Sequence, residues 1–307
     1  MNYPSSNPLE ELKNLFTRNK VFSGLILANT WIWLLVKAVQ VVFFLFNRPG
    51  REAADNWILN FLALPASLPG FLSEPWTLFT YMFLHIGFFH ILFNLLWLYW
   101  FGKIFLEFLS SRKLLLTYIL GGISGGICYM LAFNLFPVFR DLLPVSRALG
   151  ASASVMAVVT AISFYVPNYS IQLLFIGRVR IIYLVIVLFI FDFFAIPSGN
   201  SGGHIAHIGG ALFGFLYAVL LRKGKLNFRF GGFSVPDAFK KFFSSGKTGR
   251  SSAPYIGRPK SDEDYNAEKA ADQRRTDEIL EKISRGGYDS LTREEKDFLF
   301  RSSNRNR

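Results

Sequence analysis

The chain has little of what a disulfide-bonded or thiol-dependent protein requires, because its 307 residues include a single cysteine, Cys128. One cysteine excludes an intramolecular disulfide, and the apolar sequence around it indicates a small packing residue instead of a metal ligand or catalytic thiol. Histidine is also rare, with four residues, and 21 acidic residues are outnumbered by 33 lysines and arginines. Any imidazole or carboxylate chemistry must therefore draw on few side chains.

The shortage of acids leaves a formal charge of +12, which would suit nucleic acid as a partner. Most of the basic residues, however, lie just outside apolar runs or in the C-terminal tail, a pattern that sets membrane topology. Mean hydropathy is +0.32 and aromatic residues make up 17% of the chain. A chain this apolar and this long is typical of a polytopic membrane protein. We expect no nucleic-acid partner.

Six segments approach the ~20 apolar residues that a helix needs to cross a bilayer. They are 21–46, 83–105, 114–133, 148–166, 181–196 and 204–221. The first is far longer than the apolar core of a signal peptide and precedes no small-residue cleavage site, so we expect it to be retained. The predicted fold class is all-α, with six membrane helices and both termini on one side.

Basic residues near the span ends predict the orientation. One face collects Lys13, Arg18, Lys20, Lys103, Arg112, Lys113, Arg178, Arg180, Arg222, Lys223 and Lys225. The other has Arg48, Arg51, Arg140 and Arg147, which are thinly spread or offset by Glu52, Asp55, Glu74 and Asp141. The richer face is expected to be cytoplasmic and to hold both termini.

Composition divides the chain into a cytoplasmic N-terminal segment (1–20), a membrane domain (21–224), a basic Ser/Gly-rich linker (225–271) and a helical hairpin (272–307). The first outer connection, 47–75, is so apolar that we expect it to lie in the membrane interface. In the hairpin, Gly286 and Gly287 are expected to end one helix. Thr292 and Glu295 have the spacing of a capping box that begins another.

Chemistry-bearing residues gather near one end of three predicted spans. The second, fourth and sixth spans run in the same direction, so their first turns share one depth near the outer face. All four histidines, His85, His90, His204 and His207, fall in first turns of the second and sixth spans, and Ser152 begins the fourth. Polar groups in a bilayer are costly and usually line a cavity. A serine beside an imidazole is the minimum for nucleophilic catalysis.

The same site needs hydrogen-bond donors for an oxyanion and close helix packing. His90 and Asn94, four residues apart on one helix face, are candidate donors together with the Ser152 N–H. Small residues would let the fourth and sixth spans approach, with Ala153 on one and Gly210 and Gly214, a G-x-x-x-G pair, on the other.

Each feature also has a simpler interpretation. A serine in a first helical turn often serves as a cap, and G-x-x-x-G occurs in spans of every function. His204 and His207 could bind a metal with His85 and His90, but no carboxylate or cysteine completes a familiar pattern, so we expect no metal. Asp192, a lone acid in the fifth span, is interpreted as a buried, hydrogen-bonded or water-facing structural group.

Three motifs together resemble the rhomboid intramembrane serine proteases. HILFNLLW at 90–97 resembles the second-span motif, GAS at 150–152 is similar to the nucleophile motif G-x-S-G, and HIGGALFG at 207–214 resembles the sixth-span motif. The resemblance covers roughly residues 20–224. It implies that Ser152 is the nucleophile, that His207 is the general base, and that His90, Asn94 and the Ser152 amide bind the oxyanion. Gly150, Ala153, Gly210 and Gly214 would provide the packing near the site.

The resemblance further implies a Ser-His dyad without a cofactor, which cuts transmembrane segments of substrate proteins near the outer face after lateral admission. The tail is similar to a module of some bacterial relatives, which implies the bacterial inner membrane; its partner is unknown. Two departures are Ala153, where the family has glycine, and Trp76-Thr77, where many members have Trp-Arg. An inactive chaperone that binds membrane clients is the alternative. A transporter lacks support, because the ionisable groups avoid the midplane.

Overall fold

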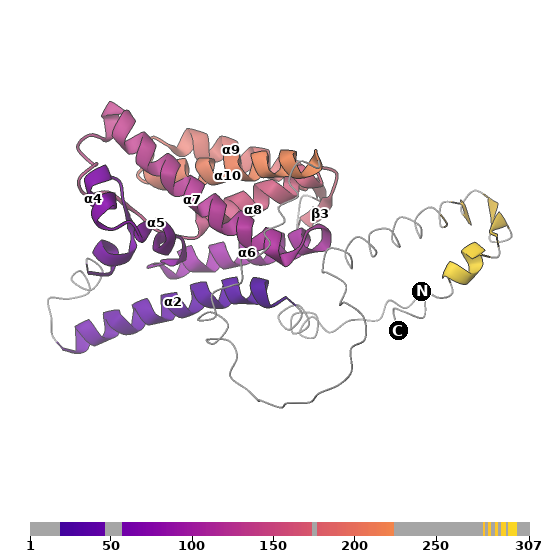
Figure 1. Cartoon of the computed structure of the whole chain (residues 1–307), viewed down its shortest axis with the longest axis horizontal. Helices are drawn as coiled ribbons and strands as arrows, with labels where there is room; N and C mark the ends of the chain where they lie inside the picture. The colour runs from indigo at the N-terminus through magenta and orange to yellow at the C-terminus, as the bar shows by residue number, and fades with distance from the viewer. Residues whose placement is uncertain are drawn as a thin grey trace, which may run out of the picture. The chain divides into compact units, whose positions relative to one another are not determined.

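A computed structural model of the chain describes residues 19–46, 57–173 and 177–223, and positions 279, 282–283, 286–287, 290–292 and 294–299 nearer the C-terminus. The chain divides into two compact units, residues 1–227 and 228–307. In the first unit, helices lie side by side along a common direction, with α2 on one side and α9 and α10 on the other (Figure 1). The predicted linker 225–271 lies outside the described residues.

The elements of the first unit follow one another in a simple order. After α2 (Lys20–Leu45) and a short helix at 57–62 come β1 (Leu64–Pro65), α4 (Leu68–Ser73), α5 (Thr77–Thr80), η1 (Tyr81–Phe83), α6 (Phe88–Phe108), α7 (Ser111–Leu135), η2 (Pro137–Phe139), β2 (Arg147–Ala148), α8 (Ser152–Tyr165), β3 (Ser170–Leu173), β4 (Gly177–Arg180), α9 (Ile181–Ala195) and α10 (Ser201–Arg222).

Each predicted span overlaps a helix, namely α2, α6, α7, α8, α9 and α10. In the described part of the chain, α2, α6, α7 and α10 are long and apolar enough to cross a membrane, whereas α8 and α9 have 14 and 15 residues. The second span begins later than predicted, at Phe88, because 81–83 form a 3-10 turn. His85 therefore precedes the helix, and because α10 begins at Ser201, His207 lies in its second turn. The expectation that these two histidines lie in first helical turns was wrong.

Helix α8 forms the centre of this unit, packed against α6, α7, α9 and α10. Its alanines leave room for close approach. A Cβ on Gly121 of α7 would collide with the Ala157 methyl, and one on Gly214 of α10 would collide with the Ala157 carbonyl. Glycine on both neighbours thus lets α7 and α10 approach α8 from two sides.

Two short antiparallel ladders accompany the helices of this mostly helical unit. β3 and β4 pair between α8 and α9. β1 and β2 pair Leu64 with Ala148 and Pro65 with Arg147. Because β2 ends four residues before Ser152, this ladder ties the 57–77 region directly to the start of α8.

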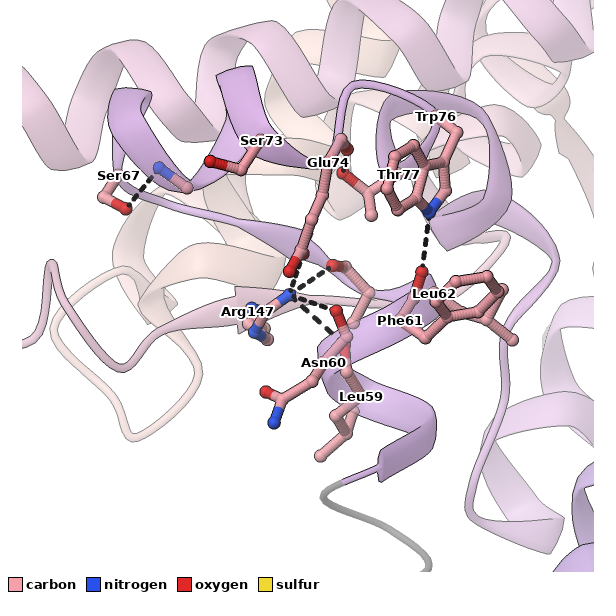
Figure 2. Close-up of polar contacts among 12 residues, drawn as sticks. Leu59, Asn60, Phe61, Leu62, Ser67, Ser73, Glu74, Trp76, Thr77 and Arg147 are labelled. Carbon is pink, nitrogen blue, oxygen red and sulfur yellow. Dashed lines mark hydrogen bonds and ion pairs between the residues drawn. The ribbon is translucent and has the colours of Figure 1, made fainter.

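Hydrogen bonds from three side chains close the end of the helix at 57–62, and Figure 2 shows those of Trp76 and Arg147. Trp76 Nε1 donates to the Phe61 carbonyl and Thr80 Oγ1 to the Leu62 carbonyl, each at 2.8 Å. Arg147 Nη1 lies 3.3, 3.1 and 3.1 Å from the carbonyl oxygens of Leu59, Asn60 and Ala63. Terminal carbonyls of a helix need such partners. At this helix end the guanidinium comes from Arg147 of β2, and Trp76 contributes its indole N–H.

The C-terminal unit shows both predicted helix signals. The N–H of Gly287, with φ of +74°, donates to the Ile283 carbonyl at 2.8 Å and ends one helical segment. Thr292 N–H donates to Glu295 Oε2 at 2.7 Å, and Glu295 N–H donates to Thr292 Oγ1 at 3.3 Å. The predicted capping box is confirmed, and residues 294–299 are helical after it.

Candidate functional site

A cavity of about 860 Å³ lies among α6, α8, α9, α10 and the segment before α8. Ser152, His207, His90 and Asn94 all line it, as do Gly150 and Ala153. Gly210 instead lies against the backbone of Ala153, and Gly214 against that of Ala157. The structure therefore brings the predicted nucleophile, base and oxyanion donors together in one cavity.

Two serines compete for the role of nucleophile, and only one faces the cavity. Ser152 is the first residue of α8 and is partly exposed there. Ser154 is completely buried against Gly122 of α7, and its hydroxyl has no hydrogen-bond partner among the described residues. Of these two serines, Ser152 is the one that a substrate in the cavity could reach, and Ser146 and Ser201 line other parts of the same cavity.

Gly150 brings the hydroxyl of Ser152 near an imidazole. Its φ is +120°, a conformation that residues with a Cβ rarely adopt, and its N–H donates to the Tyr81 carbonyl at 2.9 Å. A Cβ added there would lie 2.7 Å from His90 Nε2 and 3.8 Å from Ser152 Oγ. The imidazole of His90 and the hydroxyl of Ser152 therefore both lie beside the position that a Gly150 Cβ would occupy. Only glycine leaves that position empty.

His85 supports the turn from outside the cavity. Its Nε2 accepts the Ala151 N–H at 3.2 Å, and its Nδ1 is 3.3 Å from the Phe83 carbonyl, to which it donates in the neutral ring. Burial, reinforced by the nearby His90 ring, lowers the pKa of His85 to about 3. A neutral His85 is required because a protonated Nε2 could not accept the Ala151 N–H.

Donors for a negatively charged oxygen converge from α6. Asn94 is buried, and one hydrogen of its amide group is donated to the His90 carbonyl at 2.8 Å. A side-chain amide has two hydrogens, so the second can be offered to a ligand. The N–H of Ser152 is among the first four of α8, which lack partners within the helix.

Asp192 joins two histidines at the wall formed by α9 and α10. Its Oδ1 lies 2.8 Å from His204 Nδ1 and 2.9 Å from His207 Nδ1. The carboxylate is buried, as predicted for a hydrogen-bonded group. The expectation that no carboxylate accompanies these histidines was wrong. Possible ligand atoms of the three residues lie within 4.8 Å of one another, close enough to hold a metal ion, and the two hydrogen bonds already account for that closeness.

Ala153 directs its extra methyl toward α7. The methyl lies 2.5 Å from where a Cβ of Gly125 on α7 would be, and the Ala153 carbonyl faces Gly210 of α10. The absent side chain at Gly125 makes room for the methyl. The α8–α10 contact remains backbone against glycine.

The sequence did not predict the partners of two residues that organise this region, Asp192 and Arg147. The signal for Asp192 was its position, since it is the only charged residue within α9 and such groups are costly in a bilayer. Arg147 carried no local signal, because its partners are 73 to 88 residues away in the chain.

Two family models match the chain. The Rhomboid domain matches residues 72–224, from the end of α4 through α10, and the Family of unknown function (DUF6576) matches residues 260–305. The first match contains every residue of the cavity described above. The second lies in the C-terminal unit.

Several curated relatives are similar over the membrane region. Rhomboid protease GluP of Bacillus subtilis is 30% identical over 193 residues, which cover 62% of this chain and 35% of that protein. Rhomboid-like protein 17, chloroplastic, of Arabidopsis thaliana is 26% identical, covering 64% and 62%. Rhomboid protease GlpG of Haemophilus influenzae is 26% identical over 198 residues, covering 64% and 94%. The chain thus spans less than two thirds of the first two relatives and nearly all of the third.

Proposed function

The chain belongs to the rhomboid family, and on that basis we propose that it is an intramembrane serine endopeptidase that cleaves transmembrane segments of other proteins. The observation that carries the proposal is the cavity shared by Ser152, His207, His90 and Asn94. These residues come from three helices and supply a nucleophile, a base and oxyanion donors.

The chemistry follows from these side chains. Ser152 Oγ attacks the scissile carbonyl carbon while its proton passes to His207 Nε2, and the carbonyl electron pair moves onto oxygen. His90, Asn94 and the Ser152 N–H stabilise that oxyanion. The imidazolium then protonates the leaving amine as the C–N bond breaks. Water hydrolyses the acyl-enzyme in the same way.

The short length of α8 supports a site inside the membrane. Fourteen helical residues span about 21 Å, less than the ~30 Å of hydrocarbon. If its C-terminal end lies at the cytoplasmic surface, marked by Arg178 and Arg180, Ser152 lies below the outer surface. The cavity then supplies water from outside. In this orientation six helices cross the membrane, both termini are cytoplasmic, and the site faces the outer side.

Substrate access between α6 and α9 is the route that the packing supports. Both helices pack on α8, but described contacts between α6 and α9 are few. Side chains of both line the cavity, including Phe89 and Phe93 of α6 and Leu188 and Phe191 of α9. A substrate span could move between them from the bilayer toward Ser152.

The remaining assignments concern location and domains. We place the protein in a bacterial inner membrane, with 1–20 as a cytoplasmic segment, 21–224 as the protease domain, 225–271 as a linker and 272–307 as a helical hairpin. No partner is assigned to the hairpin. Hydrolysis by the dyad needs no cofactor.

Reconstituted protein tests the function. Liposomes containing the full chain and a fluorescently tagged single-span substrate should yield two fragments with wild type and none with Ser152→Ala. A fluorophosphonate probe should label Ser152 in wild type and not in His207→Ala. Equal cleavage by wild type and Ser152→Ala would exclude Ser152 as nucleophile, and client capture without cleavage would indicate a binding protein.

A further inference from the structure

The bond between Asp192 and His207 has a chemical consequence for the proposed reaction. An ionised carboxylate only accepts hydrogen bonds, so the 2.9 Å contact requires hydrogen on His207 Nδ1. A neutral ring with hydrogen on Nδ1 has its free electron pair on Nε2. That nitrogen is the one that must take the proton of Ser152.

We propose that Asp192 is a positioning residue for this reaction, so that the chain works through Ser152, His207 and Asp192 instead of an isolated pair. The inference rests on the proposed protease function. As Nε2 takes the serine proton, the ring becomes a cation whose Nδ1–H remains on the carboxylate. Asp192 keeps its own charge throughout and is not protonated. Its contribution is to hold the ring and to stabilise the imidazolium.

Burial and position support this role. The Asp192 side chain is 8% exposed and that of His207 is 22% exposed, so the pair is shielded from bulk water while the ring still faces the cavity. Asp192 lies near the end of α9 and His207 in the second turn of α10, and the intervening turn brings them together. A charge in this setting strengthens a hydrogen bond compared with one at the surface.

His204 shares the same carboxylate oxygen and provides a matched comparison. Its Nδ1 lies 2.8 Å from Oδ1, yet it belongs to the first turn of α10, one turn before His207. A carboxylate oxygen can accept two hydrogen bonds. Replacing His204 leaves the bond to His207 in place, whereas replacing Asp192 removes both.

The decisive experiment measures kcat and KM of the full-length protein in liposomes with the single-span substrate and EDTA present, which removes any ion from the three-residue cluster. We expect Asp192→Asn to reduce kcat by about 100-fold with KM within about twofold, because the amide no longer stabilises the imidazolium. Asp192→Glu should recover part of the loss. His204→Gln should retain kcat within about threefold. Unchanged kcat in a folded Asp192→Asn protein would overturn the inference.

Two further experimental results distinguish this role from a purely structural one. Equal losses in kcat, substrate binding and thermal stability, with no recovery by Asp192→Glu, would assign Asp192 to folding and overturn the inference. If Asp192→Asn does not fold, proton NMR of wild type labelled with ¹⁵N-histidine decides. A strongly downfield proton on His207 Nδ1, assigned through His204→Gln, supports the inference, and its absence overturns it.

The same assay keeps the two proposals distinguishable. If wild type fails to cleave, or Ser152→Ala cleaves equally, the protease function itself is wrong. If wild type cleaves, Ser152→Ala does not, and Asp192→Asn matches wild type, only the role of Asp192 is wrong.

Discussion

Arg147 and Glu74 form an ion pair, with 2.8 Å between Nη1 and Oε2, although 73 residues separate them in the chain. The same guanidinium contacts carbonyls at the end of the helix at 57–62 (Figure 2). The backbone of Arg147 pairs with that of Pro65. One side chain therefore joins the segment between α2 and α5 to the strand that leads to Ser152.

Arg147→Met should lower the thermal stability of the protein, because three helix carbonyls and a carboxylate lose their shared donor. Loss of such a partner costs about 1–3 kcal/mol. Arg140→Met, at an exposed arginine just after η2, is the matched control and should have little effect. Glu74→Gln should cost under ~1 kcal/mol, since a partly exposed pair contributes little. Thermal unfolding in detergent measures all three, and equal midpoints for both arginine variants would contradict the assignment.

Sequence patterns identified the parts of this molecule that depend on periodicity and depth. Apolar length located the helices, and the pattern of polar residues near the starts of three spans selected Ser152, His90 and His207, which line one cavity. Patterns could not locate the β1–β2 ladder, whose two-residue strands are shorter than any periodic signal. They also missed the Asp192–His207 bond, because the turn between α9 and α10 decides which residues meet. Such contacts are set by tertiary packing and not by local preference.

Acidification should destabilise the protein through His85. Its pKa is about 3 in the folded state and near 6.5 when unfolded, so below pH 6.5 the unfolded chain binds a proton that the native protein does not. The stabilisation that comes from the neutral His85 is fully present above pH 6.5 and is lost as the pH falls toward 3. Between pH 7 and pH 5 the loss from this residue is about 2 kcal/mol.

His85→Gln is the comparison that isolates this effect. Glutamine can accept the Ala151 N–H and donate to the Phe83 carbonyl, and it does not titrate. Thermal midpoints at pH 7 and pH 5 should therefore diverge less in the variant than in wild type. An identical pH dependence in both proteins would show that His85 is not the group responsible.

Gly150→Ala should abolish most activity at a moderate cost in stability. The added Cβ would meet His90 at 2.7 Å and displace an oxyanion donor, and the positive φ adds about 1–3 kcal/mol of strain. Gly177→Ala is a matched control, since its φ is +88° but nothing lies within 4 Å of a Cβ there. Both variants should lose stability, whereas only Gly150→Ala should lose kcat, by about 100-fold. Similar kcat in both would argue against His90 as a donor.

Close packing at the α7–α8 contact can be tested by moving one methyl group across it. Gly121→Ala would bring a new methyl into collision with that of Ala157, and overpacking of this kind costs about 1–3 kcal/mol. After Ala157→Gly the nearest remaining atoms are the Cα of residue 157 at 3.6 Å and Phe213 at 3.7 Å, which are ordinary contacts. The double variant should therefore be more stable than Gly121→Ala alone, although a new helix glycine costs up to ~1 kcal/mol. Thermal unfolding of wild type, the two single variants and the double variant gives the coupling free energy between the two positions. Additive losses of stability would mean that the two residues do not touch.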